Sequence, residues 1–183
     1  GELALGPLLW VHGNPAGAYR GRALGAAPPR GWRVLAVDQL GMGYSERIGE
    51  VRRLAQRIDD LGRLTDALGI TGPVVTVAHD WGGPVSLGWA LDHQDQLAGG
   101  VLTNTAVHQP EGARAPTLIR IARSAGLPQA ACRGTVPFVR GTTALTRPRP
   151  AQALRDAFVA PCSSRVRRHP GADTVPQLPR ADA

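Results

Sequence analysis

The sequence predicts an α/β protein built on a parallel sheet. Short, continuously apolar runs occupy residues 7–12, 32–37, 74–78 and 98–103, and segments of helical pattern lie between them. Strands that are apolar throughout are buried on both faces, and parallel neighbours need crossover helices to connect them. We therefore expect a central parallel sheet of about four strands flanked by helices.

The helix with the clearest pattern lies between the second and third predicted strands. Apolar residues from Leu54 to Leu68 recur at helical spacing, with Arg and Asp between them; this pattern is typical of an amphipathic helix. Gly69 is positioned to end it, because glycine readily takes the left-handed conformation at helix C-termini. A further helical stretch runs through Leu87 and Leu91.

The pattern changes after the fourth predicted strand. Residues 1–110 form the predicted α/β core, and residues 111–160 form a helical segment with short helices at 116–123 and 151–159. From residue 161 the helical periodicity ends while Arg, Pro and Ala become frequent, so 161–183 is predicted to be an irregular or disordered tail.

Composition excludes several classes of protein. The 183 residues are 43% apolar, which suffices for a globular core, and two cysteines are too few for a disulfide scaffold. No apolar run approaches the roughly 20 residues of a membrane span, and no signal peptide is recognisable. No Cys/His cluster has metal-ligand spacing and no complete GxGxxG motif opens a helix, so we expect no cofactor. These features favour a soluble cytoplasmic protein.

The net charge of +7 raises the question of a nucleic-acid partner. Residues 1–112 hold 9 Arg and 11 acidic residues, whereas residues 113–183 hold 12 Arg and 3 acidic residues. The excess positive charge therefore belongs to the second segment. Its aromatic residues are Phe138 and Phe158, whereas basic nucleic-acid grooves usually interleave cations with stacking aromatics. We expect no nucleic-acid partner.

Three distinctive turns follow predicted strands, at residues 12–15, 38–45 and 79–83. Open α/β sheets bind ligands at the carboxyl ends of their strands. Ala78, Asp80 and Gly82 form a small-x-Asp-x-Gly pattern between a strand and a helix, which is typical of a nucleophile elbow. A carboxylate at its centre attacks an electrophilic carbon and forms an alkyl-enzyme ester. The alternative is that Asp80 only caps the helix that follows.

The three turns together resemble those of α/β hydrolases of the haloalkane dehalogenase branch. Their sequences are His12-Gly-Asn-Pro15, Asp38-Gln-Leu-Gly-Met-Gly-Tyr-Ser45 and His79-Asp-Trp-Gly-Gly83. The resemblance covers residues 7–110 well and 111–160 loosely, as a partial helical cap over the site. It implies a partial α/β-hydrolase fold and a small apolar substrate.

The resemblance also implies roles for particular residues. Asp80 is the expected nucleophile, and Asn14 and Trp81 are the expected donors to the oxyanion or leaving group. An anion leaving an apolar pocket needs such donors, because an unpaired buried charge is costly. The expected supporting residues are His12, Gly13, Pro15, His79 and Gly82. His108 opens the cap segment and is a candidate pocket residue.

Three other functions stay open. Epoxide hydrolases share the Asp elbow, but they usually carry an aromatic residue at the position of Asn14 and use cap tyrosines, whereas the tyrosines here are Tyr19 and Tyr44. The β-lactone decarboxylases of olefin biosynthesis are similar to dehalogenases in these same motifs, which do not separate the two groups. A folded binding module without turnover is the third alternative.

The family completes its site with an acid and a histidine that follow later strands. We identify neither here: His169 stands in an Arg-Arg-His-Pro-Gly context without a strand and loop around it. The family's first two strands and last two strand-helix units are also not recognisable. We therefore expect a chain truncated at both ends and inactive for turnover, with four strands ordered 4-3-5-6 in the family's numbering.

Overall fold

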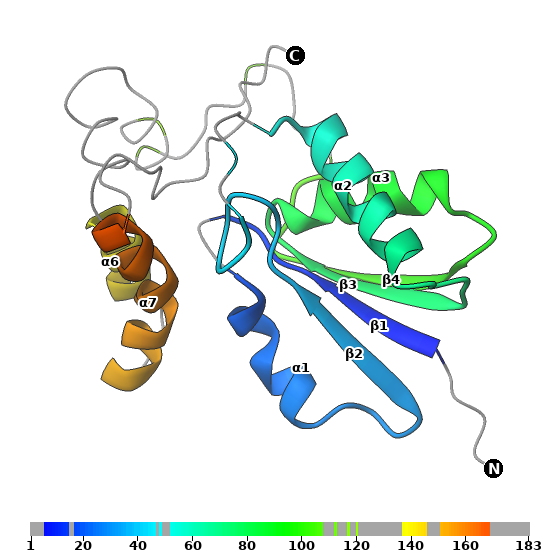
Figure 1. The fold of residues 1–183 in the computed structure, drawn as a ribbon, viewed down its shortest axis with the longest axis horizontal. Helices are drawn as coiled ribbons and strands as arrows, with labels where there is room; N and C mark the ends of the chain where they lie inside the picture. Colours follow the sequence, from blue (N-terminus) through cyan, green and yellow to red (C-terminus); the bar gives the residue numbers. More distant parts are fainter. Residues whose placement is uncertain are drawn as a thin grey trace. The chain divides into compact units, whose positions relative to one another are not determined.

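The apolar runs of the sequence form a parallel sheet of four strands (Figure 1). These strands are β1 (Gly6–Val11), β2 (Trp32–Val37), β3 (Val74–His79) and β4 (Leu97–Thr103). Their order across the sheet is β2-β1-β3-β4, and each neighbouring pair is parallel. This is the predicted order 4-3-5-6, so the α/β fold class is confirmed.

The computed structural model describes residues 6–14, 17–46, 48, 52–107, 112, 117, 120, 137–145 and 151–168. The chain divides into two compact units, Gly1–Val107 and His108–Ala183. The first unit contains the sheet, and each unit is described by itself.

Helices cover the sheet of the first unit on both sides. The helices α2 (Leu54–Ala67) and α3 (Gly82–Asp92) lie side by side on one side, while the 3₁₀ helix η1 (Ala18–Gly21) and α1 (Arg22–Ala26) lie on the other (Figure 1). The predicted end of α2 is confirmed: Gly69 has a φ of +63°, and its N–H donates to the carbonyl of Asp66 at 2.9 Å.

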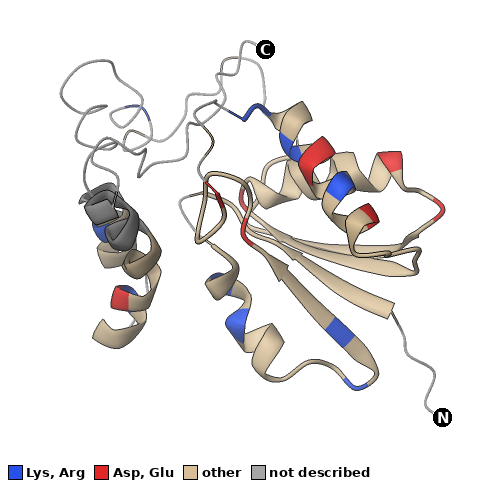
Figure 2. Cartoon of the chain, in the orientation of Figure 1, with Lys and Arg blue, Asp and Glu red and all other residues tan. Residues whose placement is uncertain are grey.

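The core forms where α2 and α3 meet the sheet. Leu9, Val74 and Trp89 have no solvent exposure. Indole Nε1 of Trp89 donates to Oγ1 of Thr65 at 3.0 Å and so joins α3 to α2 within the core. The four strands contain no Asp, Glu or Lys and a single Arg, Arg33 in β2, and these charged residues lie mainly on helices and loops in the described part of the chain (Figure 2).

Burial differs between the interior and edge strands. Residues from Leu8 to Val11 in β1 are all buried, as expected for a strand with a neighbour on each side and helices on both faces. In β4 the exposed fractions of Leu97, Val101 and Leu102 are 37%, 49% and 38%. Within the described residues, β4 pairs on one side only, with β3.

The second unit contains the helices α6 (Pro137–Leu145) and α7 (Gln152–Arg168). Val139 and Val159 are buried between them. The prediction of an irregular chain from residue 161 is wrong for residues 161–168, because α7 continues through Pro161 to Arg168. Arginine is a good helix former even where apolar periodicity is lost. The predicted helix at 116–123 lies almost wholly outside the described residues.

Candidate active site

Asp80 stands at a tight turn between β3 and α3. Its φ is +54°, an uncommon conformation for a residue other than glycine. Its carbonyl accepts hydrogen bonds from the N–H of Gly83 at 3.0 Å and from Oγ1 of Thr105 at 2.7 Å. Position 82 has no room for a side chain, because a Cβ there would lie 2.0 Å from the carbonyl oxygen of Val11. The glycine is therefore a steric requirement of this turn.

The Asp80 carboxylate points to the turn after β1. Its Oδ2 accepts the backbone N–H of Asn14 at 2.8 Å. The N-terminus of α3 has no capping hydrogen bond from a side chain, so the alternative in which Asp80 caps this helix is wrong. Gly13 allows the close approach, because a Cβ there would lie 2.3 Å from Oδ2 of Asp80 and 2.6 Å from the nitrogen of Trp81.

His12 supports the turn after β1 from inside the protein. It has no solvent exposure, and its Nδ1 lies 2.8 Å from the carbonyl oxygen of Gly13. Nε2 accepts the backbone N–H of Gln39 at 3.2 Å, so these partners assign the proton to Nδ1. Burial lowers the pKa of His12, although the Gly13 carbonyl and Asp38 act in the opposite direction. His12 is therefore a neutral positioning residue in this arrangement.

The loop after β2 connects to the same turn. Oδ1 of Asp38 accepts the N–H of Ala18 at 2.6 Å, and its Oδ2 accepts the N–H of Tyr44 at 2.9 Å. The side-chain amide of Gln39 donates to the carbonyl of His12 at 2.5 Å. The structure thus brings the three predicted turns together: residues 38–45 bond to His12, and the neighbouring Asn14 bonds to Asp80.

Arg57 anchors this loop from α2, and the sequence reasoning missed it. Its exposed fraction is 8%, and its Nη1 donates to Oε1 of Gln39 at 3.2 Å and to the carbonyl of Leu40 at 3.3 Å. Burial lowers the pKa of Arg57. A signal was present in the sequence: this arginine stands three residues after Leu54 and four before Leu61, on the apolar face of the predicted helix.

The charge of Arg20, which the sequence analysis did not single out, affects the pKa of a residue in the turn after β3. Burial lowers the pKa of His79, the Arg20 charge lowers it further, and Asp80 acts in the opposite direction. Burial also lowers the pKa of Arg20 itself, against the effect of the Asp80 carboxylate. The charges of Arg20 and Asp80 therefore act on the pKa of His79 in opposite directions.

The other predicted site residues divide into two groups. Trp81 directly precedes α3 and Gly82 begins it, whereas Pro15 and His108 lie outside the described residues. Among the described residues, no group of three His, Cys, Asp or Glu side chains is arranged to hold a metal ion. No helix in this part of the chain is long and apolar enough to cross a membrane.

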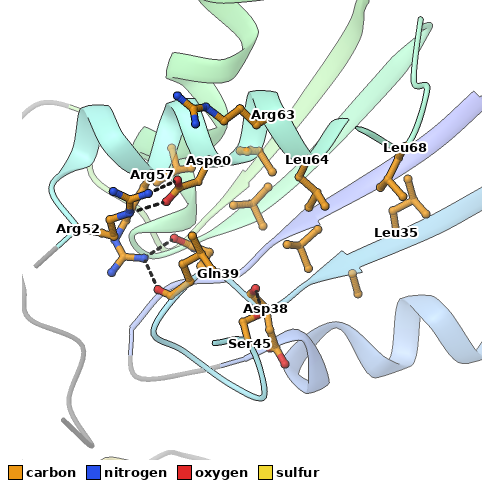
Figure 3. Close-up of a pocket in the computed structure, with 16 residues that line it drawn as sticks. Leu35, Asp38, Gln39, Ser45, Arg52, Arg57, Asp60, Arg63, Leu64 and Leu68 are labelled. Carbon is orange, nitrogen blue, oxygen red and sulfur yellow. Dashed lines mark hydrogen bonds and ion pairs between the residues drawn. The ribbon is translucent and has the colours of Figure 1, made fainter. Parts of the chain in front are cut away.

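A pocket of about 630 Å³ lies between β2 and α2 (Figure 3). Leu35, Leu64 and Leu68 form part of its apolar wall. At one end Arg52 makes two hydrogen bonds to the Asp60 carboxylate, at 2.7 and 3.1 Å. Asp80 is not among the lining residues, so this pocket does not include the Asp80 carboxylate.

The fold and the three joined turns define a class of protein. The family model for the alpha/beta hydrolase fold matches residues 6–132, so the chain belongs to the α/β hydrolase fold family. Its relatives place it in the haloalkane dehalogenase-like branch of that family.

Relatives of two kinds are similar to this chain in sequence. The chain is 36% identical over 165 residues to a cis-3-alkyl-4-alkyloxetan-2-one decarboxylase of Xanthomonas campestris, an alignment that covers 84% of this chain and 55% of the relative. It is 34% identical over 97 residues to a haloalkane dehalogenase of Sphingobium indicum, covering 51% of this chain and 33% of the relative. The chain thus spans about half the length or less of these curated relatives.

A solved structure shares the fold. The haloalkane dehalogenase DbeA from Bradyrhizobium elkani superposes with a TM-score of 0.75 at 25% identity. The superposition covers 93% of this chain and 61% of that one.

Proposed function

We propose that Asp80 is the nucleophile of an α/β hydrolase that displaces a leaving group from an sp³ carbon. The observation that carries the proposal is the geometry of Asp80. Its backbone is held at a φ of +54°, and its carboxylate accepts the Asn14 N–H at 2.8 Å instead of capping α3. Uncommon backbone conformations of this kind are concentrated at functional sites.

In the proposed step, a carboxylate oxygen of Asp80 forms a bond to the substrate carbon. The bond between carbon and leaving group breaks, and its electron pair departs with the leaving group. Asn14 and Trp81 are the proposed donors to the anion that forms, and the N-terminus of α3 favours negative charge beside the turn. Hydrolysis of the resulting ester then needs an activated water molecule, for which we assign no base among the described residues.

Incubation with 1-bromohexane tests this proposal. We expect release of at most one bromide per chain, together with a stable hexyl adduct that peptide mass spectrometry assigns to Asp80. The chain has no lysine and only two cysteines, so competing alkylation sites are few. Asp80→Asn is expected to abolish the adduct, because a neutral amide is a poor nucleophile.

Asp92→Asn is the matched control, since Asp92 ends the same helix that Asp80 precedes. This variant should still form the adduct. Adduct formation that persists in Asp80→Asn would refute the assignment of the nucleophile. Absence of any adduct in the folded wild-type chain would favour a binding module, and several bromides per chain would show that a base is present.

A second candidate substrate is an oxetan-2-one, a four-membered cyclic ester. The observation that favours it is coverage: the oxetanone decarboxylase of Xanthomonas campestris aligns with 84% of this chain, whereas the dehalogenase of Sphingobium indicum aligns with 51%. Incubation with a cis-3,4-dialkyl oxetan-2-one, with CO₂ measured in the headspace, tests this candidate. CO₂ release that is lost in Asp80→Asn would support it.

A further inference from the structure

The pocket between β2 and α2 has the size and the mixed walls of a small-molecule site (Figure 3). Its volume of about 630 Å³ lies within the range of roughly 300–1,000 Å³ that is typical of ligand pockets. Leu35, Leu64 and Leu68 belong to its apolar lining, and several charged side chains line it as well. This combination suits a ligand with an apolar body and a charged head.

Arg57 is a nearly buried cation of this pocket. Its exposed fraction is 8%, and its Nη1 donates to two uncharged oxygens, Oε1 of Gln39 and the carbonyl of Leu40. Among the described residues, Arg57 has no ion-pair partner within 4 Å. Burying a charge without a partner of opposite charge is costly. The pocket therefore favours an anion next to Arg57.

The two carboxylates that line the pocket already have other partners. The Asp60 carboxylate accepts two hydrogen bonds from Arg52, at 2.7 and 3.1 Å. The Asp38 carboxylate accepts the backbone N–H groups of Ala18 and Tyr44. Neither carboxylate forms a hydrogen bond or an ion pair with Arg57 in the part of the chain that the structure describes.

The remaining donors of Arg57 match the shape of a carboxylate. Its Nε and Nη2 make no hydrogen bond to any described residue. These two nitrogens are the pair with which Arg52 holds the Asp60 carboxylate at one end of the same pocket. Such a planar pair of donors binds both oxygens of a carboxylate at once. The contact between Arg52 and Asp60 thus shows the kind of contact that Arg57 offers to a ligand.

The leucines of α2 continue the line that Arg57 begins. Leu64 and Leu68 follow Arg57 by about two and three helical turns, so the three side chains share one face of α2. At a rise of about 1.5 Å per residue, this row is roughly 16 Å long. It has a cation at one end and apolar side chains along the rest, as an extended alkyl carboxylate requires.

We propose that the pocket between β2 and α2 binds an aliphatic carboxylate. Nε and Nη2 of Arg57 hold the carboxylate, and the alkyl chain lies along Leu64 and Leu68. Burial of the chain supplies affinity, because each methylene group that leaves water contributes favourable free energy. Arg57 supplies the preference for an anion. The inference goes beyond the proposed reaction and does not depend on it, because Asp80 does not line this pocket.

Isothermal titration calorimetry with octanoate, dodecanoate and 1-octanol tests the inference. Octanoate should bind about 10- to 100-fold more tightly than 1-octanol, the scale expected for hydrogen bonds to a charged group. Dodecanoate should bind more tightly than octanoate, by up to about fourfold for each added methylene. Equal affinities for octanoate and 1-octanol, or no binding of either carboxylate, would overturn the inference.

Variants at Arg57 test the charged end of the pocket. Arg57→Gln should weaken octanoate binding about 10- to 100-fold and change 1-octanol binding by less than about threefold. Arg57→Lys should be intermediate, because it keeps the charge and loses the paired donors. Arg63→Gln is the matched control, since Arg63 is exposed on the same helix and already pairs with Asp59 at 3.0 Å. It should change octanoate binding by less than about threefold.

A variant at the apolar end keeps the inference testable if Arg57→Gln does not fold. Leu68 is 50% exposed, so Leu68→Ser is expected to fold, which urea unfolding checks. This variant should weaken the binding of dodecanoate more than that of octanoate, because only the longer chain extends far along the row of leucines. Unchanged affinity for dodecanoate would contradict the proposed position of the chain.

Competition separates this site from the proposed active site. Saturating octanoate should leave alkylation of Asp80 by 1-bromohexane unchanged, and Asp80→Asn should bind octanoate as the wild type does. Octanoate that blocks the alkylation would bind at the Asp80 turn, which would overturn this inference while the nucleophile stands. Absence of an Asp80 adduct together with Arg57-dependent octanoate binding would overturn the proposed function alone.

Discussion

The ends of β3 and β4 make the same unusual backbone turn in different surroundings. Asp80 follows β3 with a φ of +54°, and Asn104 follows β4 with a φ of +45°. They are the non-glycine residues with positive φ in the described chain. Asp and Asn tolerate this conformation better than most residues.

Packing around the two turns is different. The Asp80 turn is enclosed by Gly13, Gly82 and Gly83, and a Cβ on any of them would lie within 2.3 Å of another residue. Asn104 itself is exposed and follows an exposed strand. The two turns nevertheless meet, because Thr105 directly follows Asn104 and donates to the carbonyl of Asp80. The turn after β3 carries the Asp80 carboxylate, and the turn after β4 supplies a hydrogen bond to the Asp80 carbonyl.

The largest effect is expected from filling the space at position 82. Gly82→Ala should lower the free energy of unfolding by about 3 kcal/mol, because its Cβ would clash with the Val11 carbonyl oxygen. This oxygen belongs to the backbone of β1, so it cannot move aside by rotation about a side-chain bond. Gly99→Ala in β4 is the control, since no atom lies within 4 Å of its Cβ position. Urea unfolding measures both variants.

The control should stay within about 0.5 kcal/mol of the wild type, as substitutions at uncrowded surface positions usually do. Equal losses in the two variants would contradict the difference in packing between the β3 and β4 ends. A Gly82→Ala protein that does not fold at all would agree with it.

A smaller effect on the free energy of unfolding is expected from protonation of His12 at low pH. Burial lowers the pKa of His12 in the folded protein below its ordinary value of 6.5, so the unfolded chain binds the proton more tightly. Stability should therefore be fully present above about pH 6.5 and fall as the pH decreases below it, by at most about 1.4 kcal/mol per pH unit. Urea unfolding at about pH 7.5 and about pH 5.5 measures this slope.

His12→Gln supplies the comparison for that slope, because glutamine does not titrate. The variant should lose less stability than the wild type between the two pH values, whatever its stability at neutral pH. Identical pH dependence of the two proteins would contradict a buried, neutral His12 beneath the Asn14 turn.

The smallest effect is expected at Asn104. Asn104→Ala should cost about 1 kcal/mol, because an alanine is strained at positive φ, whereas Asn104→Gly should be close to neutral. Thermal or urea unfolding of the two variants gives the difference between them. If alanine and glycine are equivalent at this position, the backbone at the end of β4 is free to relax, unlike the one at Asp80.

Much of the sheet was predictable because the information is local. The apolar runs specify the strands, the spacing from Leu54 to Leu68 specifies α2, and the pattern around Asp80 specifies a strand-to-helix turn. Hydrogen bonds between turns were not predictable in the same way. The contact from Asn14 to Asp80 spans 66 positions of sequence, and it depends on how β1 and β3 align in the sheet.

Two further differences between the sequence-based expectations and the structure have physical reasons. Arg57 lies on the buried face of α2, and hydrophobic periodicity does not say which partners an arginine has there. Its partners, Gln39 and Leu40, come from the loop after β2, which is distant in sequence. The helix α7 continues past Pro161 to Arg168 although proline removes one backbone hydrogen bond, so the loss of apolar periodicity after residue 161 does not mark the end of the helix. For Arg20 the sequence offered no signal, because the position of η1 is set by contacts with Asp38 and Trp10.

The strand order has a consequence for how the edges of the sheet are linked to the Asp80 turn. Asp80 and the His12–Asn14 turn follow β3 and β1, the two interior strands, while β2 and β4 form the margins of the sheet in the part of the chain that the structure describes. The loops after both margins nevertheless reach this centre: the Gln39 amide donates to the carbonyl of His12, and Thr105 donates to the carbonyl of Asp80. The Asp80 turn is thus coupled to both margins, and a change in either edge strand is expected to reach it through these loop contacts, while the pairing of β1 with β3 keeps Asn14 aligned with Asp80.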